Sequence, residues 1–443
     1  MHTGGHFCNP IKKLLDKSRL NFNGLKFAIH WGGIYRLTFW YGYNKLKNVF
    51  YVQGGGLIIF EKYFVSIIRS EHSIGVIIRA SLFIPSGFYW LILKCREFLY
   101  RRGILKKVKA PVPVISIGNI TMGGTGKTPM VEFVAKYLSE KGKKVAILSR
   151  GYASRVMSQE SGVKGKDSGL KTHDSRLTND EYLVLSENLP DIPNLLGKNR
   201  VKSARTAIGE YGAECLILDD GFQHWGLERN LDIVVIDALN PFDLERLIPQ
   251  GALREPLQNL RRAHIFVLSH CDQCLQSSLD LIKRRLKQVN DNAPIVETVH
   301  YPVQLCSLNQ PASGGETLLS TEWLNGKRIY AFCALGNPES FRLTLNGLGA
   351  RVSKFTCFPD HHFYKQGELD VIIREAESLG AEAIITTQKD GVKIKSLNPP
   401  LPPFSKGGMV GIIPLLVLKI EVRVVSGKDA LESALSTMEY LSG

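Results

Sequence analysis

Residues 118–129 read Gly-Asn-Ile-Thr-Met-Gly-Gly-Thr-Gly-Lys-Thr-Pro, and this glycine-rich stretch determines the predicted fold. An apolar, β-branched run, 112–117, precedes the stretch, and a helical pattern and a second apolar run, 145–149, follow it. Strand, glycine-rich turn, helix and strand in this order form the context of a phosphate-binding loop. The sequence therefore predicts an α/β protein built on a mostly parallel sheet.

The residues of this loop suit a nucleotide with Mg²⁺. Glycines allow successive backbone N–H groups to point at phosphate oxygens, and the N-terminus of the following helix adds partial positive charge. Lys127 is expected to reach the β- and γ-phosphates, and the Thr128 hydroxyl to ligate Mg²⁺. Thr121 stands where the full pattern has a further glycine. The predicted nucleotide-binding residues of the loop are Gly123, Gly124, Thr125, Gly126, Lys127 and Thr128.

A third apolar run, 215–218, is followed by two acids, Asp219 and Asp220. Carboxylates at the carboxyl end of a strand lie where open α/β sheets bind ligands, so one of these two acids is expected to hold Mg²⁺. Further runs predict strands, with helical patterns between several of them, at 233–236, 265–268, 329–333 and 383–386. The alternation predicts a sheet with helices on both faces, like that of phosphate-loop NTPases.

The composition is that of an ordinary globular protein. Of the 443 residues, 44% are hydrophobic and 22% are charged, which excludes wholesale disorder, collagen and a multi-span membrane protein. The net charge of +15 is concentrated near the N-terminus, since residues 1–110 carry 18 Lys and Arg against 4 Asp and Glu. This asymmetry favours a local anionic partner over a whole-domain nucleic-acid binder. The eight cysteines show no framework spacing, and Cys271 and Cys274 are interpreted as free thiols.

The N-terminal region contains a candidate membrane-associating segment. Residues 74–93 are apolar apart from Arg79, and residues 94–109 hold seven basic residues and one acid. A basic cluster beside an apolar helix is attracted to anionic lipid. The preferred interpretation is a helix lying in one leaflet, with a true span and a buried core helix as alternatives, because Arg79 and the Pro85–Gly87 break weaken a straight span.

Several motifs, taken in order, resemble the tetraacyldisaccharide 4′-kinases, which phosphorylate a lipid A precursor. The resemblance runs from about residue 74 to the C-terminus and rests on the loop together with Ser149-Arg150-Gly151-Tyr152, Asn179-Asp180-Glu181, Asp219-Asp220-Gly221-Phe222-Gln223-His224, 247–256 (LIPQGALREP) and 358–362 (FPDHH). It implies transfer of the γ-phosphate of ATP-Mg²⁺ to the 4′-hydroxyl of a tetraacyldisaccharide 1-phosphate. It also implies two α/β domains with the active site in the cleft between them.

The resemblance also implies roles for individual residues. Asp180 would be the catalytic base, oriented by His361, although the family usually has Gly-Asp-Glu-Pro where this chain has Asn179-Asp180-Glu181-Tyr182. Helix capping by Asp180 is the alternative. Glu255 is a third candidate metal ligand, with an ion pair to Arg254 as the alternative. Gln223 and His224 are expected to line the phosphate site, and Lys389 either faces the site or forms a surface ion pair.

The expected organisation has four parts: an extension at 1–70, a membrane-associating basic helix at 71–110, a kinase domain at 111–320 and a smaller α/β domain at 321–443. A proline-rich insertion, 396–414, interrupts the last part. The basic residues Arg101, Arg102, Lys106 and Lys107 are candidates for contact with lipid or with the substrate 1-phosphate.

Two other functions compete with the lipid-sugar kinase. One is a phosphate-loop kinase or ligase acting on a small soluble substrate, and the other is a non-catalytic, membrane-bound nucleotide switch. The lipid kinase implies ATP and Mg²⁺ as cofactors and a lipid-linked disaccharide and an anionic membrane surface as partners. It implies neither nucleic acid nor an obligate protein partner. The expected location is the cytoplasmic face of the inner membrane.

Overall fold

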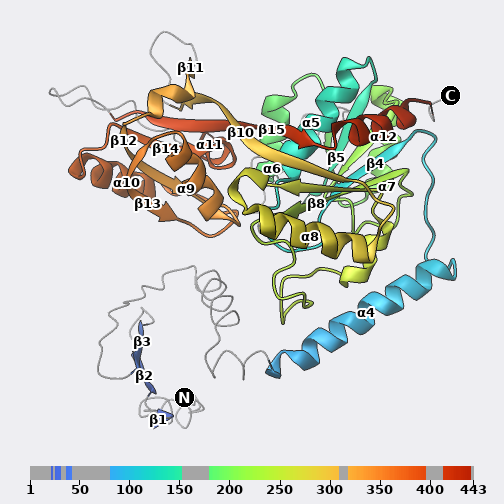
Figure 1. Ribbon diagram of the computed structural model, residues 1–443, viewed down its shortest axis with the longest axis horizontal. Helices are drawn as coiled ribbons and strands as arrows, with labels where there is room; N and C mark the ends of the chain where they lie inside the picture. Colours follow the sequence, from blue (N-terminus) through green and yellow to red (C-terminus); the bar gives the residue numbers. More distant parts are fainter. Residues whose placement is uncertain are drawn as a thin grey trace, which may run out of the picture. The chain divides into compact units, whose positions relative to one another are not determined.

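The computed structural model describes residues 21–22, 25–30, 36–41, 80–151, 179–308, 318–395 and 413–440 (Figure 1). Met1–Val76 and Ile77–Gly443 form separate compact units. In the first unit, β1 (Asn21–Phe22), β2 (Leu25–His30) and β3 (Arg36–Tyr41) pair antiparallel. The rest of the predicted extension, Tyr152, and residues 396–412 of the predicted insertion lie outside the described residues.

A single 12-stranded sheet organises the second unit, and we divide it into two halves. The phosphate-loop half contains β4 (Val114–Gly118), α5 (Lys127–Glu140), β5 (Val145–Ser149), α6 (Asp180–Asn188), β6 (Asn194–Leu196), α7 (Arg200–Tyr211), β7 (Cys215–Asp219), β8 (Leu231–Asp237), η1 (Leu257–Arg262), β9 (Ile265–Ser269), η2 (Cys271–Gln273) and α8 (Gln276–Val289). The second half contains β11 (Leu318–Leu319), η3 (Thr321–Leu324), β12 (Arg328–Cys333), α9 (Pro338–Gly347), β13 (Arg351–Cys357), α10 (Gln366–Ser378), β14 (Ala383–Thr387) and α11 (Gln388–Lys395).

Two long strands, β10 (Ile295–Ser307) and β15 (Leu415–Ser426), pair antiparallel and join the halves. The start of β10 pairs with β9, whereas the start of β15 pairs with β14 at the other end of the ribbon. Apart from this pair and the short β11, neighbouring strands of the sheet are parallel. Because β10 and β15 run in opposite directions, the carboxyl ends of the two parallel sets face each other along the ribbon (Figure 1).

Helices cover both faces of each half, as the sequence predicts. In the phosphate-loop half, α5 and α6 pack on one face and α7 and α8 on the other. In the second half, α9 and α10 cover opposite faces. The C-terminal α12 (Lys428–Tyr440) places Leu431 and Leu435 in the core of the phosphate-loop half. The last residues of the predicted 321–443 domain therefore pack with the other half, because β15 carries the chain back to it.

The strand predictions agree with the structure for every apolar run that the sequence analysis singled out. Among the strands of this sheet, the sequence analysis did not identify β6, β10, β11, β13 or β15. Most residues of β10 and β13 are half-buried or exposed, and polar residues are interspersed along both strands. These two strands are therefore more exposed to solvent than the central strands are. Such strands lack the continuous apolar pattern of strands buried on both faces.

The helix α4 (Phe83–Arg101) combines the end of the predicted apolar segment with the start of the basic one. Pro85 lies in its first turn, where a missing N–H is tolerated, so the helix continues through the predicted break. Across the described part of the chain, no helix is long and apolar enough to cross a membrane. Tyr89 Oη donates to the Arg254 carbonyl at 2.8 Å, and Arg96 Nη2 lies 3.0 Å from Glu255 Oε1. These contacts fix α4 to the phosphate-loop half.

Candidate active site

The phosphate-binding loop connects β4 to α5. Gly126 is the residue before the first turn of α5 and has φ +82°, and Gly123 has φ +108°, conformations that favour glycine. A Cβ on Gly126 would lie 2.8 Å from His300 Nε2, so the packing beneath the loop also requires glycine there. Lys127 begins α5 and is buried. The loop therefore presents backbone N–H groups and one buried cation at the carboxyl edge of the sheet.

The two acids after β7 differ in their partners. Asp220, with φ +51°, receives two hydrogen bonds from Arg254 Nη1, at 2.8 and 2.9 Å, and its Oδ1 lies 3.7 Å from Lys127 Nζ. Burial opposes ionisation of Asp220, but Lys127 and Arg254 hold its pKa below the usual value. Asp219 is buried and its Oδ2 accepts from Ser149 Oγ at 3.4 Å. Burial, with the nearby Glu181 and Asp220 charges, raises the pKa of Asp219 to about 7.

The residues of this edge fit an Mg²⁺ ion. Asp219 Oδ1 is buried without a hydrogen-bond partner among the described residues, which leaves a carboxylate oxygen available to a cation. No group of three or more His, Cys, Asp or Glu in the described chain is placed to hold a metal ion. This agrees with Mg²⁺ in kinases, which binds through one or two protein ligands together with the substrate phosphates. Asp219 and Thr128 are the residues that would hold it.

The predicted base and its partner are brought together from the two halves. Asp180 is the first residue of α6, and Asn179 caps that helix by accepting from the Glu181 N–H. His361 lies in the segment after β13 and has φ +59°. Its Nδ1 lies 2.9 Å from Asp180 Oδ1 and 3.0 Å from Oδ2. The predicted Asp–His pair is therefore present, although 181 positions separate the two residues in sequence.

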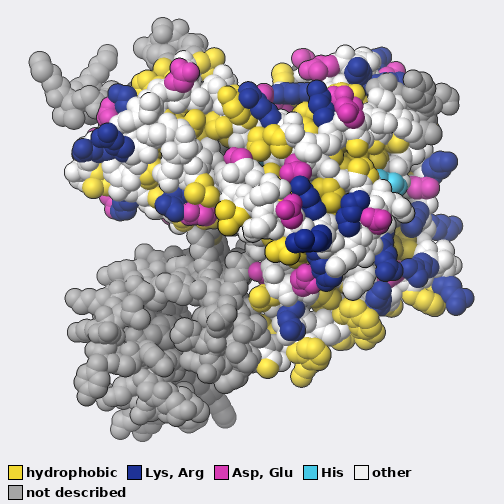
Figure 2. All heavy atoms as spheres, in the orientation of Figure 1, with side chains coloured by type: hydrophobic (Ala, Val, Ile, Leu, Met, Phe, Trp, Pro, Cys, Tyr) yellow, Lys and Arg dark blue, Asp and Glu magenta, His cyan; other side chains and the backbone are white. Residues whose placement is uncertain are grey.

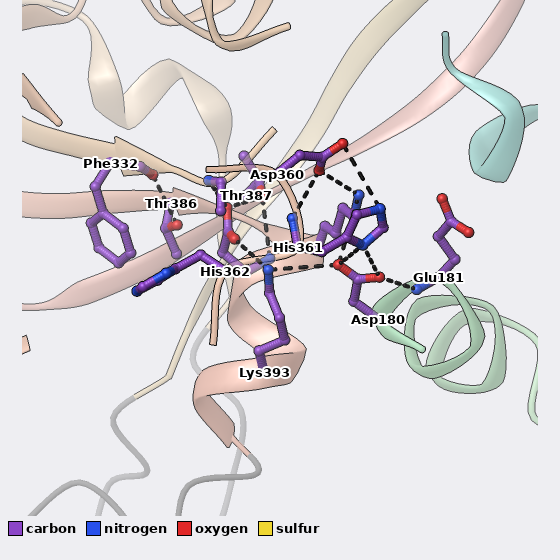
Figure 3. A network of polar contacts seen from close by, with 12 residues as sticks. Asp180, Glu181, Phe332, Asp360, His361, His362, Thr386, Thr387 and Lys393 are labelled. Carbon is purple, nitrogen blue, oxygen red and sulfur yellow. Dashed lines mark hydrogen bonds and ion pairs between the residues drawn. The ribbon is translucent and has the colours of Figure 1, made fainter. Parts of the chain in front are cut away.

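Two lysines of α11 complete the surroundings of Asp180 (Figure 3). Lys389 Nζ lies 3.7 Å and Lys393 Nζ 3.6 Å from Asp180 Oδ2. Burial alone would raise the pKa of Asp180, but the His361 hydrogen bond and the two ammonium charges lower it to about 2. The same hydrogen bond raises the pKa of His361. At neutral pH Asp180 is therefore an ionised acceptor held by His361, Lys389 and Lys393.

One cleft is lined by residues from both halves of the sheet, and its described lining does not include Asp180, His361, Asp219 or Asp220. Its lining includes the loop residues from Gly124 to Thr128, Glu181 beside the base, and Lys389 of α11. The space in the cleft is about 1110 Å³ including the part open to solvent. Gly336, after β12, approaches the loop so closely that a Cβ there would lie 2.5 Å from the Gly124 nitrogen. The two carboxyl edges thus form opposite walls of one site.

Three residues predicted for the site have other contacts. Gln223 Nε2 donates to the Asn119 carbonyl at 2.8 Å. Burial and nearby arginines lower the pKa of His224 to about 4, so it is neutral. Glu255 is fully buried, with its two oxygens bonded to Arg96, Arg262 and Asn259. None of the three is among the described residues that line the cleft, so the nucleotide and metal roles given to them stay predictions.

Sequence analysis missed the roles of Lys393 and of Arg254 as the partner of Asp220. Lys393 follows Lys389 by four residues, a spacing that places both side chains on one face of a helix. That spacing is a usable signal once α11 is recognised as a helix. The Arg254–Asp220 pair joins residues 34 positions apart and depends on the path of the chain between β8 and η1. Cys271 and Cys274 are free, as predicted.

Comparison with known proteins gives consistent matches. The model of the tetraacyldisaccharide-1-P 4′-kinase family matches residues 78–439. A tetraacyldisaccharide 4′-kinase of Anaeromyxobacter sp. (strain K) is 37% identical over 362 residues, covering 82% of this chain and 91% of that protein. One from Halothermothrix orenii is 40% identical over 339 residues, covering 75% and 88% respectively. The crystal structure of LpxK from Aquifex aeolicus in complex with ATP is 29% identical, with a TM-score of 0.57 over 82% of this chain and 99% of that one.

Proposed function

The chain belongs to the tetraacyldisaccharide-1-P 4′-kinase family, and we propose how its residues divide the work of that reaction. The activity is transfer of the γ-phosphate of ATP to the 4′-hydroxyl of a tetraacyldisaccharide 1-phosphate, a step of lipid A biosynthesis. Phosphoryl transfer depends mainly on positioning the two reactants and neutralising phosphate charge. The two walls of the cleft supply these two requirements separately.

In this proposal the phosphate-binding loop, with Asp219 and Asp220, forms the donor wall, which binds ATP. The backbone N–H groups of Gly124, Thr125 and Gly126 cradle the phosphates at the N-terminus of α5. Lys127 reaches the β- and γ-phosphates, and Asp220 with Arg254 keeps its ammonium group in place. Bound at Thr128 and Asp219, Mg²⁺ would neutralise charge on the same phosphates. Ser149 holds the second oxygen of Asp219, which fixes the direction in which that carboxylate points.

Where the two halves meet, Asp180 with His361 and Lys389 forms what we call the acceptor wall, and Asp180 accepts a hydrogen bond from the acceptor hydroxyl. A carboxylate with a pKa of about 2 is a weak base, so it serves mainly to orient the hydroxyl while the bond to phosphorus forms. A loose transition state requires little proton transfer before the phosphoryl group has moved. His361 holds the carboxylate through its Nδ1, and Lys389 lies where both Asp180 and the cleft are within its reach.

One observation carries this proposal. Lys389 lines the same cleft as Lys127 and Thr128, and its Nζ lies 3.7 Å from Asp180 Oδ2. The carboxylate therefore stands beside the donor site rather than in a separate part of the molecule. A soluble-substrate kinase and a nucleotide switch would both use the donor wall, but a switch has no need of an ionised acceptor on the acceptor wall.

The test of the proposed activity is transfer of label from γ-labelled ATP to tetraacyldisaccharide 1-phosphate in mixed micelles. The expected product carries the new phosphate at the 4′ position, and unacylated disaccharide 1-phosphate serves as the control acceptor. Transfer at equal rates to the control acceptor would favour the soluble-substrate kinase. Nucleotide hydrolysis with neither acceptor phosphorylated would favour the nucleotide switch.

We also propose that α4 holds the enzyme on an anionic membrane surface. Three of its apolar side chains, Phe83, Ile84 and Phe88, are 63%, 79% and 65% exposed. Figure 2 shows hydrophobic side chains gathered over α4, with Lys and Arg beside them. An exposed apolar face next to basic residues is typical of a helix lying in a lipid interface. Lipid A precursors carry acyl chains, so this surface on the cytoplasmic side of the inner membrane is where the enzyme would meet them.

The contacts of α4 join this surface to the donor wall. Tyr89 contacts the backbone of Arg254, whose side chain holds Asp220.

Replacing Ile84 and Phe88 together with serine should lower binding to vesicles containing anionic lipid about tenfold or more, because two large apolar groups no longer enter the interface. Sedimentation with vesicles measures this. Equal binding by the variant and the wild type would exclude α4 as the anchor.

A further inference from the structure

Asp390 is a buried carboxylate that the proposed mechanism leaves without a role. It belongs to α11 and is fully buried. Its Oδ2 accepts from the Ala334 backbone N–H at 3.0 Å and from Thr387 Oγ1 at 2.7 Å. Its Oδ1 lies 3.0 Å from Lys393 Nζ. A charge removed from water needs such partners, so Asp390 fixes both the end of β12 and the Lys393 ammonium group.

Lys393 links Asp390 to Asp180, which belongs to the phosphate-loop half of the sheet. It is buried, and its Nζ lies 3.6 Å from Asp180 Oδ2 while the Tyr364 ring centroid lies 5.5 Å away. Figure 3 shows Lys393 rising from α11 toward Asp180. Neither Lys393 nor Asp390 is among the described residues that line the cleft. Their link to the proposed chemistry is the ion pair between Lys393 and Asp180.

The other contact of Asp390 leads to the donor wall. Ala334 begins the short segment that continues to Gly336, and Gly336 approaches the backbone of Gly124 in the phosphate-binding loop. One buried carboxylate thus touches the segment beside the loop on one side and, through Lys393, the proposed base on the other. The hydrogen bonds that hold it are inside the second half of the sheet.

We infer that Asp390 and Lys393 form a positioning unit that sets the place of the Asp180 carboxylate relative to the nucleotide. The inference rests on the proposed role of Asp180 as the carboxylate that accepts a hydrogen bond from the acceptor hydroxyl and orients it. A misplacement of about 1 Å is enough to reduce a positioned reaction about 10²-fold. Loss of the unit should therefore reduce kcat by 10-fold to 100-fold and leave the KM for ATP unchanged.

The pKa of His361 supplies a second readout, because it depends on the charges around Asp180. The charged groups facing Asp180 are His361 from the segment after β13 and Lys389 and Lys393 from α11. Glu181 is its neighbour in α6, and its backbone N–H donates to Asp180 Oδ1. His361 in turn faces Asp180, Asp360 and Lys389. Lys393→Met takes one positive charge away from the Asp180–His361 pair, so the pKa of His361 should rise above its wild-type value in that variant.

The experiment compares Lys393→Met with the double variant Lys393→Met/Asp390→Asn. The single variant leaves a buried carboxylate without its cation and is expected to be less stable, whereas the double variant removes both charges and should melt close to the wild type. Lys395→Met is the matched control, because it removes a lysine from the same helix whose ion pair with Glu187 is exposed. The expected result is a folded double variant with kcat lowered 10-fold to 100-fold and an unchanged KM for ATP, together with a raised His361 pKa in Lys393→Met, measured by NMR.

A folded double variant with wild-type kcat would overturn the inference. Asp180→Asn in the same assay separates this failure from failure of the proposed function. If Asp180→Asn is inactive while the double variant is fully active, the positioning unit alone is wrong. If Asp180→Asn is itself fully active, the proposed base is wrong and the inference fails with it.

Discussion

The two walls of the cleft are built in different ways. The donor wall takes Lys127, Asp219 and Asp220 from one half of the sheet, where β4 and β7 are paired neighbours. The acceptor wall exists only where the halves meet, because Asp180 comes from α6 and His361, Lys389 and Lys393 come from the second half. Nucleotide binding should therefore tolerate changes at the acceptor wall, whereas phosphate transfer should require both walls.

The largest expected effect separates the walls directly. Lys127→Met removes the cation expected to neutralise the transferred phosphate, and transfer should fall about 10³-fold or more with weaker ATP binding. His361→Gln should lower the transfer rate about 10²-fold with ATP affinity unchanged, because His361 contacts only the acceptor wall. Calorimetric titration with ATP and the labelled transfer assay measure the two quantities. Equal loss of ATP affinity in both variants would show that the walls do not act separately.

A smaller effect is expected where the walls touch. Gly336→Ala places a methyl group 2.5 Å from the Gly124 nitrogen, so the segment after β12 has to move away from the loop. Overpacking of this kind costs about 1–3 kcal/mol, which corresponds to a rise in the KM for ATP of about 5-fold to 150-fold.

The control for this variant is Gly347→Ala in α9, where a Cβ meets nothing within 4 Å. It should leave the KM unchanged and raise helix stability slightly, since alanine is the better helix former. Equal KM values for Gly336→Ala, Gly347→Ala and wild type would mean that the close approach of Gly336 to the loop has no part in nucleotide binding.

The smallest effect concerns the stability that the acceptor wall contributes. The pKa of Asp180 is lowered to about 2 from its usual 3.8, so this group favours folding above pH 3.8, and its contribution is lost as the pH falls through about 2. Between pH 5 and pH 3 the wild type should lose about 1 kcal/mol of unfolding free energy from this group.

Asp180→Asn should lack that component, because an amide does not titrate. Denaturant unfolding of wild type and variant at both pH values gives the difference. If the two proteins lose the same free energy between pH 5 and pH 3, the ion pairs around Asp180 do not form in solution.

The same difference between the two walls explains which site residues could be predicted from the sequence. The loop and the acids after β7 are local patterns, each with a strand before it, so their chemistry is legible without a structure. Asp180 and His361 were found through resemblance to a family, since nothing local relates residues 181 positions apart. Lys393 was missed because its partner Asp180 lies in the other half, which β10 and β15 turn toward it. The Arg254–Asp220 pair was missed because it depends on the path of the chain between β8 and η1.

Fold prediction succeeded and failed for a related reason. Central strands such as β7 and β8 are buried along their whole length and appear as continuous apolar runs. The joining strand β10 is 13 residues long and largely half-exposed, so its sequence does not stand out from a loop. The element that turns the two carboxyl edges toward each other is therefore the one that the sequence shows least clearly.

The central claim is that one cleft holds a donor wall and a separately assembled acceptor wall whose base is Asp180. Asp180→Asn tests it most directly, with the exposed Asp191→Asn as the matched control. The account predicts that Asp180→Asn binds ATP-Mg²⁺ as the wild type does and transfers phosphate to tetraacyldisaccharide 1-phosphate at least 10²-fold more slowly. Transfer by Asp180→Asn at the wild-type rate, with ATP binding intact, would contradict it.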